Sequence, residues 1–327
     1  MSAITTTTAY SPTALEADEM VRHYEYDAYN RLLDDEGFLV WPKLLPAPLI
    51  DAHLAGLDAV MTQTAPGSTA PQAEAMAAVR RARARFHREH QPTLEMIFAP
   101  ELVAFLRYRF GETPVMRQPQ TGYYQQHTPA HTESLNIKPS DDREVRIWCA
   151  LEDVDPTAGA VYYVPRSHRL IAATLEERLG REHPEFLQTL RALAAPTTLT
   201  EFGDRTGPFF RDVRHVELPR LIAESQSRKV APILEKGDVV IFRSDVVHGT
   251  SACRDDARTR KYLTAFWAGR STRWYHTRAW WGPHWDHRAD ENSFAAPVED
   301  LSVGSRIEFS DYNRAYIESF ARPVHVA

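Results

Sequence analysis

The segment VRIWCALEDVDPTAGAVYYVP (residues 145–165) contains two short apolar runs, VRIWCAL and AVYYVP, separated by a cluster of Asp, Pro, Thr and Gly residues. Runs of β-branched and aromatic residues bounded by such clusters are typical of β-strands. Three more runs of this kind flank the segment, namely PVMRQ (114–118), DVVIF (238–242) and KYLTAFW (261–267). Strands this short and this closely spaced predict a sandwich or barrel rather than a parallel α/β sheet.

Helical patterns precede this β region. FLVW (38–41) has the composition of a short buried strand, and a helix that Asp51 could cap is predicted to follow it. Two further helices are predicted over AEAMAAVRRARARFHREH (73–90) and PELVAFLRYRF (100–110), because both are rich in strong helix formers.

The chain has 327 residues, of which 43% are hydrophobic, enough for one large core. Residues 1–18 are rich in Thr, Ser and Ala and predict a flexible arm, which leaves 19–327 as a single catalytic domain. A helical stretch and a polar loop in residues 171–234 interrupt the strands. We expect this insertion to lie at the mouth of the barrel, where long loops shape binding sites.

Composition excludes several classes of function. The net charge is −6 and the Lys and Arg residues are scattered, which argues against a nucleic-acid partner. Two cysteines, Cys149 and Cys253, support neither a disulfide framework nor a cysteine-ligated zinc site. No stretch of about 20 residues is apolar enough to span a membrane, and the N-terminus lacks the features of a cleaved signal. We therefore expect a cytoplasmic protein; its oligomeric state is left open.

A metal site is predicted from three residues. His131 and Glu133 stand two residues apart in HTPAHTES, so in a strand both side chains would point to the same face. His248 ends the run EKGDVVIFRSDVVHGTS (235–251), where an apolar strand would deliver a histidine to its end. Two imidazoles and one carboxylate on one face are typical of non-haem iron(II) with positions left open for a co-substrate and O₂.

An arginine after the third ligand suggests the co-substrate. In RDDARTRKYLTAFW (254–267), Arg258 and Arg260 share parity, so either side chain could face inward. The distal carboxylate of 2-oxoglutarate is the kind of group that a guanidinium holds with two parallel hydrogen bonds. We prefer Arg260 and keep Arg258 as the alternative.

Other histidines have simpler interpretations. HREH (87–90) falls in a predicted helix, where residues two apart cannot share a metal ion. HWDH (284–287) has no third ligand following from a strand end. His127 is followed two residues later by Pro129 rather than by a carboxylate, and His168 fits a hydrogen-bonded turn residue.

Four stretches resemble the phytanoyl-CoA dioxygenase family of iron(II)/2-oxoglutarate oxygenases. They are DDEGFLVWPKLL (34–45), QQHTPAHTES (125–134), RIWCALEDVDPTAGAVYYVPRSHRL (146–170) and KGDVVIFRSDVVHGTSACRDDARTRKYLTAFW (236–267). The resemblance implies a mainly β fold, the double-stranded β-helix or cupin-like jelly roll, with N-terminal helices packed outside. It also implies that Trp148 lies beside the co-substrate and that Thr250 and Arg260 hold the co-substrate's carboxylate. Trp148 fits a core position equally well.

This sequence departs from the family in its carboxylate ligand. The family usually has Asp in the metal-binding tripeptide, whereas this chain has the longer Glu133. Related halogenases have Gly or Ala there, so a carboxylate leaves chloride no vacated position and argues against halogenation. The expected function is that of a dioxygenase that uses Fe(II), 2-oxoglutarate and O₂ to hydroxylate a C–H bond of a small-molecule metabolite, with release of succinate and CO₂.

Two other classes of function remain as alternatives. One is a metal-binding cupin-type barrel without oxygen chemistry, such as an isomerase or a ligand-binding pseudo-enzyme, and the other is a zinc hydrolase. A plain metal barrel has no need of Arg260, and we find no placed general base for hydrolysis. Among candidate substrate contacts, Arg211, Trp274 and Tyr275 fit a carboxylated or ring-containing small molecule.

Overall fold

A computed structural model describes residues 14–64, 86, 90–123, 127–135, 137–139, 141–172, 175, 181–185, 208–209, 211–255, 257–272, 274–276 and 296–297. Its α-helices are α1 (Ala14–Asp35), α2 (Ala47–Thr64), α4 (Gln91–Ile97), α5 (Pro100–Phe110) and α9 (Leu218–Glu224), with short helical turns η1 (Glu133–Leu135), η2 (His168–Ala172) and η3 (Val213–Glu217). Its strands are β1 (Phe38–Trp41), β2 (Pro114–Gly122), β3 (Ile137–Pro139), β4 (Glu144–Ala150), β5 (Val161–Tyr163), β6 (Val239–Phe242), β7 (His248–Thr250), β8 (Tyr262–Gly269), β9 (Trp274–His276) and β10 (Ala296–Pro297).

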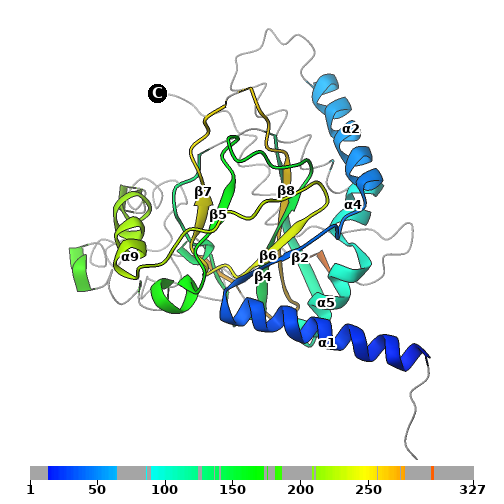
Figure 1. The fold of residues 1–327 in the computed structure, drawn as a ribbon, viewed down its shortest axis with the longest axis horizontal. Coiled ribbons are helices and arrows are strands. Elements are labelled where there is room, and N and C mark those ends of the chain that lie inside the picture. Colours follow the sequence, from blue (N-terminus) through cyan, green and yellow to red (C-terminus); the bar gives the residue numbers. More distant parts are fainter. Residues whose placement is uncertain are drawn as a thin grey trace, which may run out of the picture.

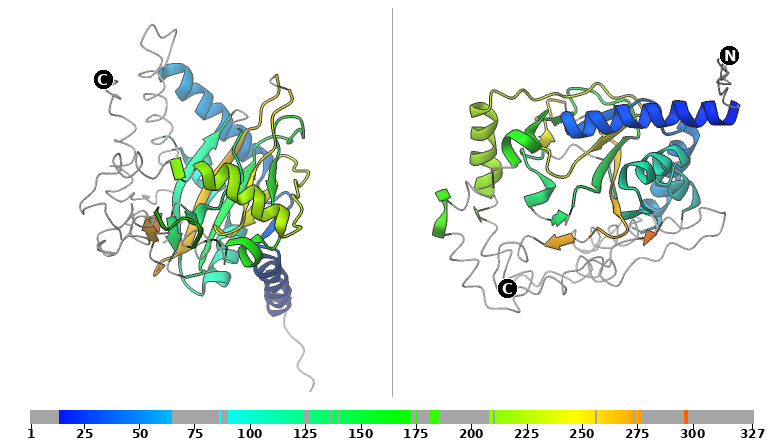
Figure 2. Two further views of the ribbon diagram at one scale, coloured as in Figure 1. Left: turned by 90° about the vertical axis from the view of Figure 1, so that its left-hand side faces the viewer. Right: turned by 90° about the horizontal axis from the view of Figure 1, so that it is seen from below.

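The strands form one large and two small sheets. The large sheet has the order β1-β6-β4-β8-β2-β10, and the small sheets pair β5 with β7 and β3 with β9. Every pairing is antiparallel. Figure 1 and Figure 2 show β5 and β7 lying apart from the large sheet, with helices at the periphery. The prediction of a mainly antiparallel β protein with added helices is confirmed.

Alternation along the central strands divides the core in two. Val145, Ile147 and Cys149 of β4 pack in one cluster with residues of the N-terminal helices, including Phe105 of α5. Trp148, between them, belongs to a different cluster that lies on the opposite face of β4. The helices therefore cover the outer face of the large sheet, and the inner face is turned toward β5 and β7 (Figure 1).

The small β5–β7 sheet has the same division. Tyr163 packs against Phe242 of the large sheet, with ring centroids 5.1 Å apart. Its neighbour Tyr162 instead joins a cluster with Val213 and Leu221 from η3 and α9. The described part of the 171–234 insertion thus covers the outer side of the small sheet, and the inner side of that sheet packs on the large sheet through Tyr163.

Two helix predictions require correction. Helix α2 begins at Ala47, so Asp51 lies inside the helix and is not its cap; Pro48 suits the first turn because its missing N–H is not needed there. Helix α1 begins at Ala14, so residues 14–18 are helical rather than part of a flexible arm. Ala and Glu residues there favour helix. Residues 1–13 and most of the helix predicted over 73–90 lie outside the described residues.

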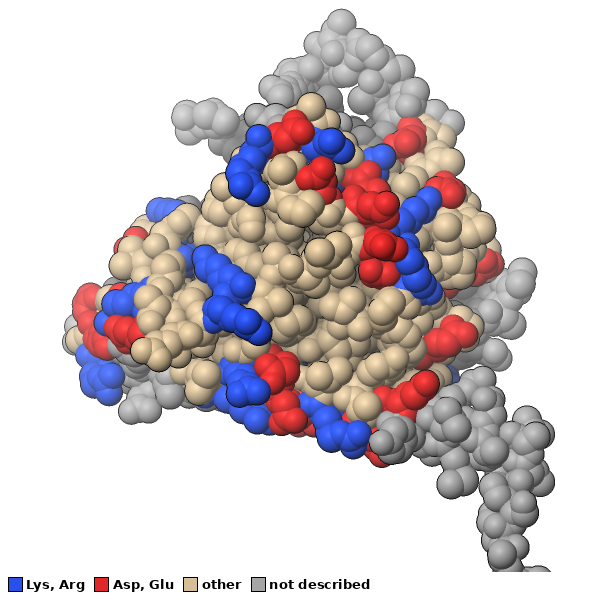
Figure 3. Space-filling view, viewed as in Figure 1, with Lys and Arg blue, Asp and Glu red and all other residues tan. Residues whose placement is uncertain are grey.

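Charges on the face seen in Figure 3 are mixed, with acidic and basic side chains interspersed rather than gathered into one basic stripe. Within the described part of the chain, no helix is long and apolar enough to cross a membrane.

Candidate metal centre and co-substrate site

Two of the predicted ligands are directly paired across the backbone. His131 and His248 exchange both of their backbone hydrogen bonds, each with an N···O distance of 2.9 Å. Such a pair places the two side chains on the same face, and the ring centroids lie 4.2 Å apart. His248 is the first residue of β7 and not the end of the preceding apolar strand, as was predicted, because β6 already ends at Phe242. The start of β7 and the segment before η1 therefore bring the two imidazoles together.

Glu133 reaches the same point, although not by the predicted geometry. The segment leaves the extended conformation after His131, because Glu133 begins the turn η1 and donates its backbone N–H to Ser244 O at 2.8 Å. The strand alternation expected for the tripeptide is therefore wrong. Glu133 Oε1 nevertheless lies 3.6 Å from His131 Nε2 and 3.3 Å from His248 Nε2. One ligand atom from each residue lies within 4.8 Å of the others.

Both histidines are fixed in the form that binds metal. His131 Nδ1 lies 2.9 Å from Pro129 O, and His248 Nδ1 lies 2.9 Å from Val246 O. A carbonyl oxygen only accepts, so each Nδ1 carries the proton and each Nε2 presents a lone pair toward Glu133. Burial lowers the pKa of His131 to about 4 and that of His248 well below its usual value. Both imidazoles are therefore neutral near pH 7.

Arg146 is a site residue that the sequence did not identify. Its guanidinium contacts Glu133 Oε1, donates from Nε to Thr264 Oγ1 at 3.0 Å and lies 4.3 Å from the ring centroid of Phe266. The signal for it was present, because Arg146 stands two residues before Trp148 and so faces the same side of β4. Arg146 offsets the charge of Glu133 and orients its carboxylate.

The two arginines after His248 differ in burial. Arg260 is 2% exposed, donates to Gly159 O and lies 5.6 Å from the ring centroid of Tyr262. Arg258 is exposed, and its guanidinium lies 3.4 Å from both Asp255 and Asp155. Only Arg260 therefore presents its guanidinium to the interior.

The residues around Arg260 form a buried wall. Trp148 stacks on Tyr262 with ring centroids 5.4 Å apart. The Thr250 hydroxyl accepts a hydrogen bond from Thr128 N at 2.8 Å. The hydroxyl of the fully buried Tyr163 has no hydrogen-bond partner among the described residues. Burial raises the pKa of Tyr163, and the positive charges of Arg146 and Arg260 oppose that rise, so both arginines lie near this phenol.

The other histidines considered in the sequence are not part of this ligand set where the structure describes them. His168 is buried and its Nε2 lies 3.0 Å from Asp34 O, which confirms its interpretation as a hydrogen-bonded turn residue. His90 is bonded to Thr93 at 2.9 Å. His127 is exposed and lines a cavity together with Tyr162 and Thr250. Residues 284–287 lie outside the described residues, as do the side chains of Trp274 and Tyr275, and Arg211 is exposed.

A second cluster also has metal-ligand chemistry. Glu182, His183 and Glu217 bring potential ligand atoms within 4.8 Å of one another. Arg220 already pairs with Glu182 at 2.7 Å and with Glu217 at 2.5 Å, on the protein surface. Glu182 is exposed, His183 and Glu217 are half-buried, and both carboxylates have a cationic partner, so this cluster is an ion-pair network near the surface rather than a rival metal centre.

The comparison with protein families agrees with the buried centre. A model of the family described as phytanoyl-CoA dioxygenase (PhyH) matches residues 33–261. The chain belongs to the phytanoyl-CoA dioxygenase family. The matched residues include His131, Glu133, His248 and Arg260. No curated protein matches the sequence.

Several solved structures are similar to this family member at low sequence identity. The non-haem monooxygenase ThoJ in complex with nickel has 13% identity and a TM-score of 0.50, over 89% of this chain and 93% of ThoJ. The non-haem α-ketoglutarate-dependent epimerase SnoN from nogalamycin biosynthesis has 14% identity and a TM-score of 0.49, over 88% of this chain and 95% of SnoN. HygX from Streptomyces hygroscopicus, with nickel and 2-oxoglutarate bound, has 16% identity and a TM-score of 0.42, over 75% of this chain and 87% of HygX.

Proposed function

We propose that this protein is an iron(II)- and 2-oxoglutarate-dependent oxygenase that hydroxylates a C–H bond of a small molecule. The observation that carries the proposal is the convergence of His131 Nε2, His248 Nε2 and a Glu133 oxygen, together with the burial of Arg260. We further propose that the two facing sheets form a double-stranded β-helix.

The donor set fits iron(II). Two neutral imidazoles and one carboxylate, all on one side, hold a ferrous ion and leave its other coordination positions for small ligands. The backbone carbonyls behind both Nδ1 atoms fix the orientation of the rings, and Arg146 does the same for the Glu133 carboxylate.

The buried wall fits 2-oxoglutarate. Arg260 would pair with the distal carboxylate of the co-substrate, assisted by the Thr250 hydroxyl. Trp148, stacked on Tyr262, would form an apolar side of this space. The Tyr163 hydroxyl would gain the acceptor that the described residues do not supply, and a buried hydroxyl without a partner is otherwise unfavourable.

When bound, iron and 2-oxoglutarate supply the activation of O₂, with succinate and CO₂ as products of the co-substrate. The protein's own residues then have three tasks. His131, Glu133 and His248 would hold the metal, and Arg260 and Thr250 would hold the co-substrate. The stacked rings of Trp148 and Tyr262 would exclude water. Hydroxylation requires in addition that the substrate's target carbon be held near that open face.

Anaerobic addition of iron(II) and 2-oxoglutarate tests the proposal. The chelate should give a weak visible charge-transfer band that neither component gives alone, and admission of air with a substrate should release succinate. A zinc hydrolase or a plain ligand-binding barrel predicts no band and no O₂-dependent succinate. Absence of the band in folded, iron-loaded protein would contradict the proposal.

A further inference from the structure

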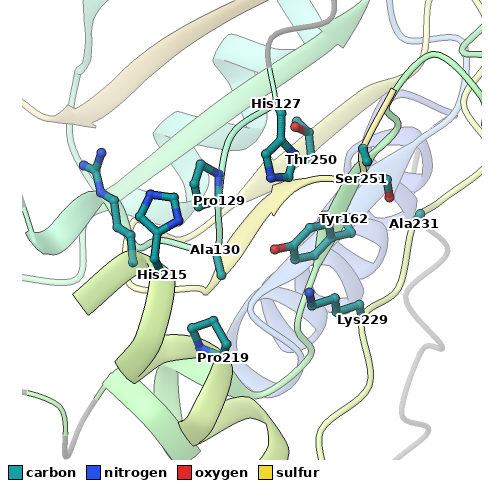
Figure 4. Close-up of a pocket in the computed structure, with 12 residues that line it drawn as sticks. His127, Pro129, Ala130, Tyr162, His215, Pro219, Lys229, Ala231, Thr250 and Ser251 are labelled. Carbon is teal, nitrogen blue, oxygen red and sulfur yellow. The ribbon is translucent and has the colours of Figure 1, made fainter. Parts of the chain in front are cut away.

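A cavity beside the metal centre is lined by basic side chains. It has a volume of about 380 Å³. Among the described residues that line it, none is Asp or Glu, and four carry side-chain nitrogen, namely His127, Arg214, His215 and Lys229. Figure 4 shows the amino group of Lys229, the hydroxyl of Tyr162 and the ring of His127 directed into the same space, with His215 across it.

The cavity borders the strand that carries a predicted metal ligand. Tyr162 lies over β7 so closely that a Cβ on Gly249, the residue after His248, would come within 2.7 Å of the Tyr162 hydroxyl. Pro129 and Ala130, just before His131, also line the cavity. Tyr162 faces away from Tyr163, whereas Thr250 shares its face with His248. Thr250, the last residue of β7, also lines the cavity, so the cavity reaches the face of the small sheet that carries His248.

The amino group of Lys229 contacts an aromatic ring rather than a described carboxylate. Lys229 lies 4.6 Å from the ring centroid of Tyr162, and no ion pair joins it to a described carboxylate. Glu217, at the end of the turn η3 that carries Arg214, is paired with Arg220 at 2.5 Å. Burial raises the pKa of Tyr162 to about 12, so its hydroxyl remains a hydrogen-bond donor at neutral pH.

Arg214 connects this cavity with the metal centre. Arg214 lines the cavity together with Ala130, the residue before His131. Burial lowers the pKa of Arg214 itself, and an anion bound beside it would offset that desolvation.

We infer that this cavity binds an oxyanion, a carboxylate or phosphate, at the remote end of the substrate, with Arg214 and Lys229 as its cationic contacts and Tyr162 as a neutral donor. The inference rests on the proposed function in one respect, because it makes the oxygenase substrate an anionic small molecule. Anion binding itself requires neither metal nor 2-oxoglutarate.

Calorimetric titration of the full-length, metal-free protein tests the inference. The probes are phenyl phosphate, benzoate and the neutral benzamide, at low ionic strength. At least one anion should bind and benzamide should not, and the ratio of the two anion affinities identifies the preferred group. Loss of one charge-assisted contact in Arg214→Gln should weaken binding about tenfold or more. Lys229→Gln, at a more exposed position, should weaken it about threefold.

Arg228→Gln is the matched control, because Arg228 is adjacent to Lys229 and exposed but does not line the cavity. Its anion affinity should equal that of the unmodified protein. If Arg214→Gln does not fold, Lys229→Gln and Lys229→Glu still decide the question. Equal binding of benzamide, or anion binding unchanged in the Lys229 variants, would overturn the inference.

The charge-transfer experiment is a separate readout. A normal band together with no anion binding contradicts the cavity assignment alone. Anion binding without a band contradicts the oxygenase and leaves the cavity as an anion site.

Discussion

The guanidinium of Arg146 contacts the carboxylate of Glu133 in the interior, where the two side chains are 15% and 11% exposed. The same carboxylate oxygen faces Nε2 of both His131 and His248. Glu133 thus supplies the negative charge of the ligand set beside two neutral imidazoles, and Arg146 offsets part of that charge.

Glu133→Ala should abolish turnover, with a fall of at least about 100-fold, because the loss of a partner behind a ligand already lowers affinity or activity 10- to 100-fold. Iron content after dialysis and succinate release measure the effect. Glu133→Asp keeps the charge and should retain part of both. Full activity in Glu133→Ala would show that the ligand assignment is wrong.

Arg260→Ala should raise the dissociation constant of 2-oxoglutarate about 100-fold, because a buried charge-assisted pair with a carboxylate is removed. The amplitude of the charge-transfer band, titrated with 2-oxoglutarate, gives this constant. Arg258→Ala is the matched control and should leave it unchanged, since Arg258 is exposed and paired with Asp155 and Asp255. Equal effects of the two variants would refute the role of Arg260.

Tyr163→Phe should weaken 2-oxoglutarate binding about fivefold without lowering the free energy of unfolding of the metal-free protein. The deleted hydroxyl has no partner among the described residues, so its removal breaks no internal hydrogen bond there. Tyr162→Phe, on the other face of β5, should leave 2-oxoglutarate affinity unchanged. Marked destabilisation by Tyr163→Phe would mean that the hydroxyl is a structural group.

Gly159→Ala should destabilise the protein more than Gly111→Ala. Both glycines have a left-handed backbone, with φ of +73° and +67°, so alanine introduces similar backbone strain, about 1 kcal/mol, at each. A Cβ on Gly159 would also meet Ser251 O at 3.0 Å, whereas one on Gly111 meets nothing within 4 Å. Chemical denaturation measures the difference, and only Gly159→Ala should in addition weaken 2-oxoglutarate binding, since Arg260 is bonded to Gly159 O.

The metal-free protein should lose stability as the pH falls from about 6.5 to 4. Burial lowers the pKa of His53 to about 4, and its ring nitrogens are bonded to Thr93 and Thr121 at 2.8 and 3.2 Å. The unfolded chain binds a proton first in this range, so His53 contributes about 3 kcal/mol above pH 6.5 that is lost as the pH approaches 4. His53→Gln should flatten the dependence of the unfolding free energy on pH, and an unchanged slope would contradict this account.

The sequence by itself determined the residue types of the site and the strands β1, β2, β4, β5, β6 and β8. Patterns such as VVIF and YLTAFW identify strands because alternation and β-branching are local properties. The helix over Pro100–Phe110 was predicted with its observed bounds, since Pro at its start and Gly111 after its end are local signals.

Only the tertiary structure decided which side chains meet. Arg258 and Arg260 share parity in the sequence, and burial within the folded sheets separates them. Glu133 reaches the two histidines through a turn held by Ser244 rather than through strand alternation. Arg146 shares parity with Trp148, which places it on the same face of β4, but only the fold brings it to Glu133. Arg214 was not identified because its position depends on the packing of the insertion, which no local pattern encodes. Side-chain convergence is set by sheet pairing and by the packing of the insertion, and these depend on contacts between residues far apart in the chain.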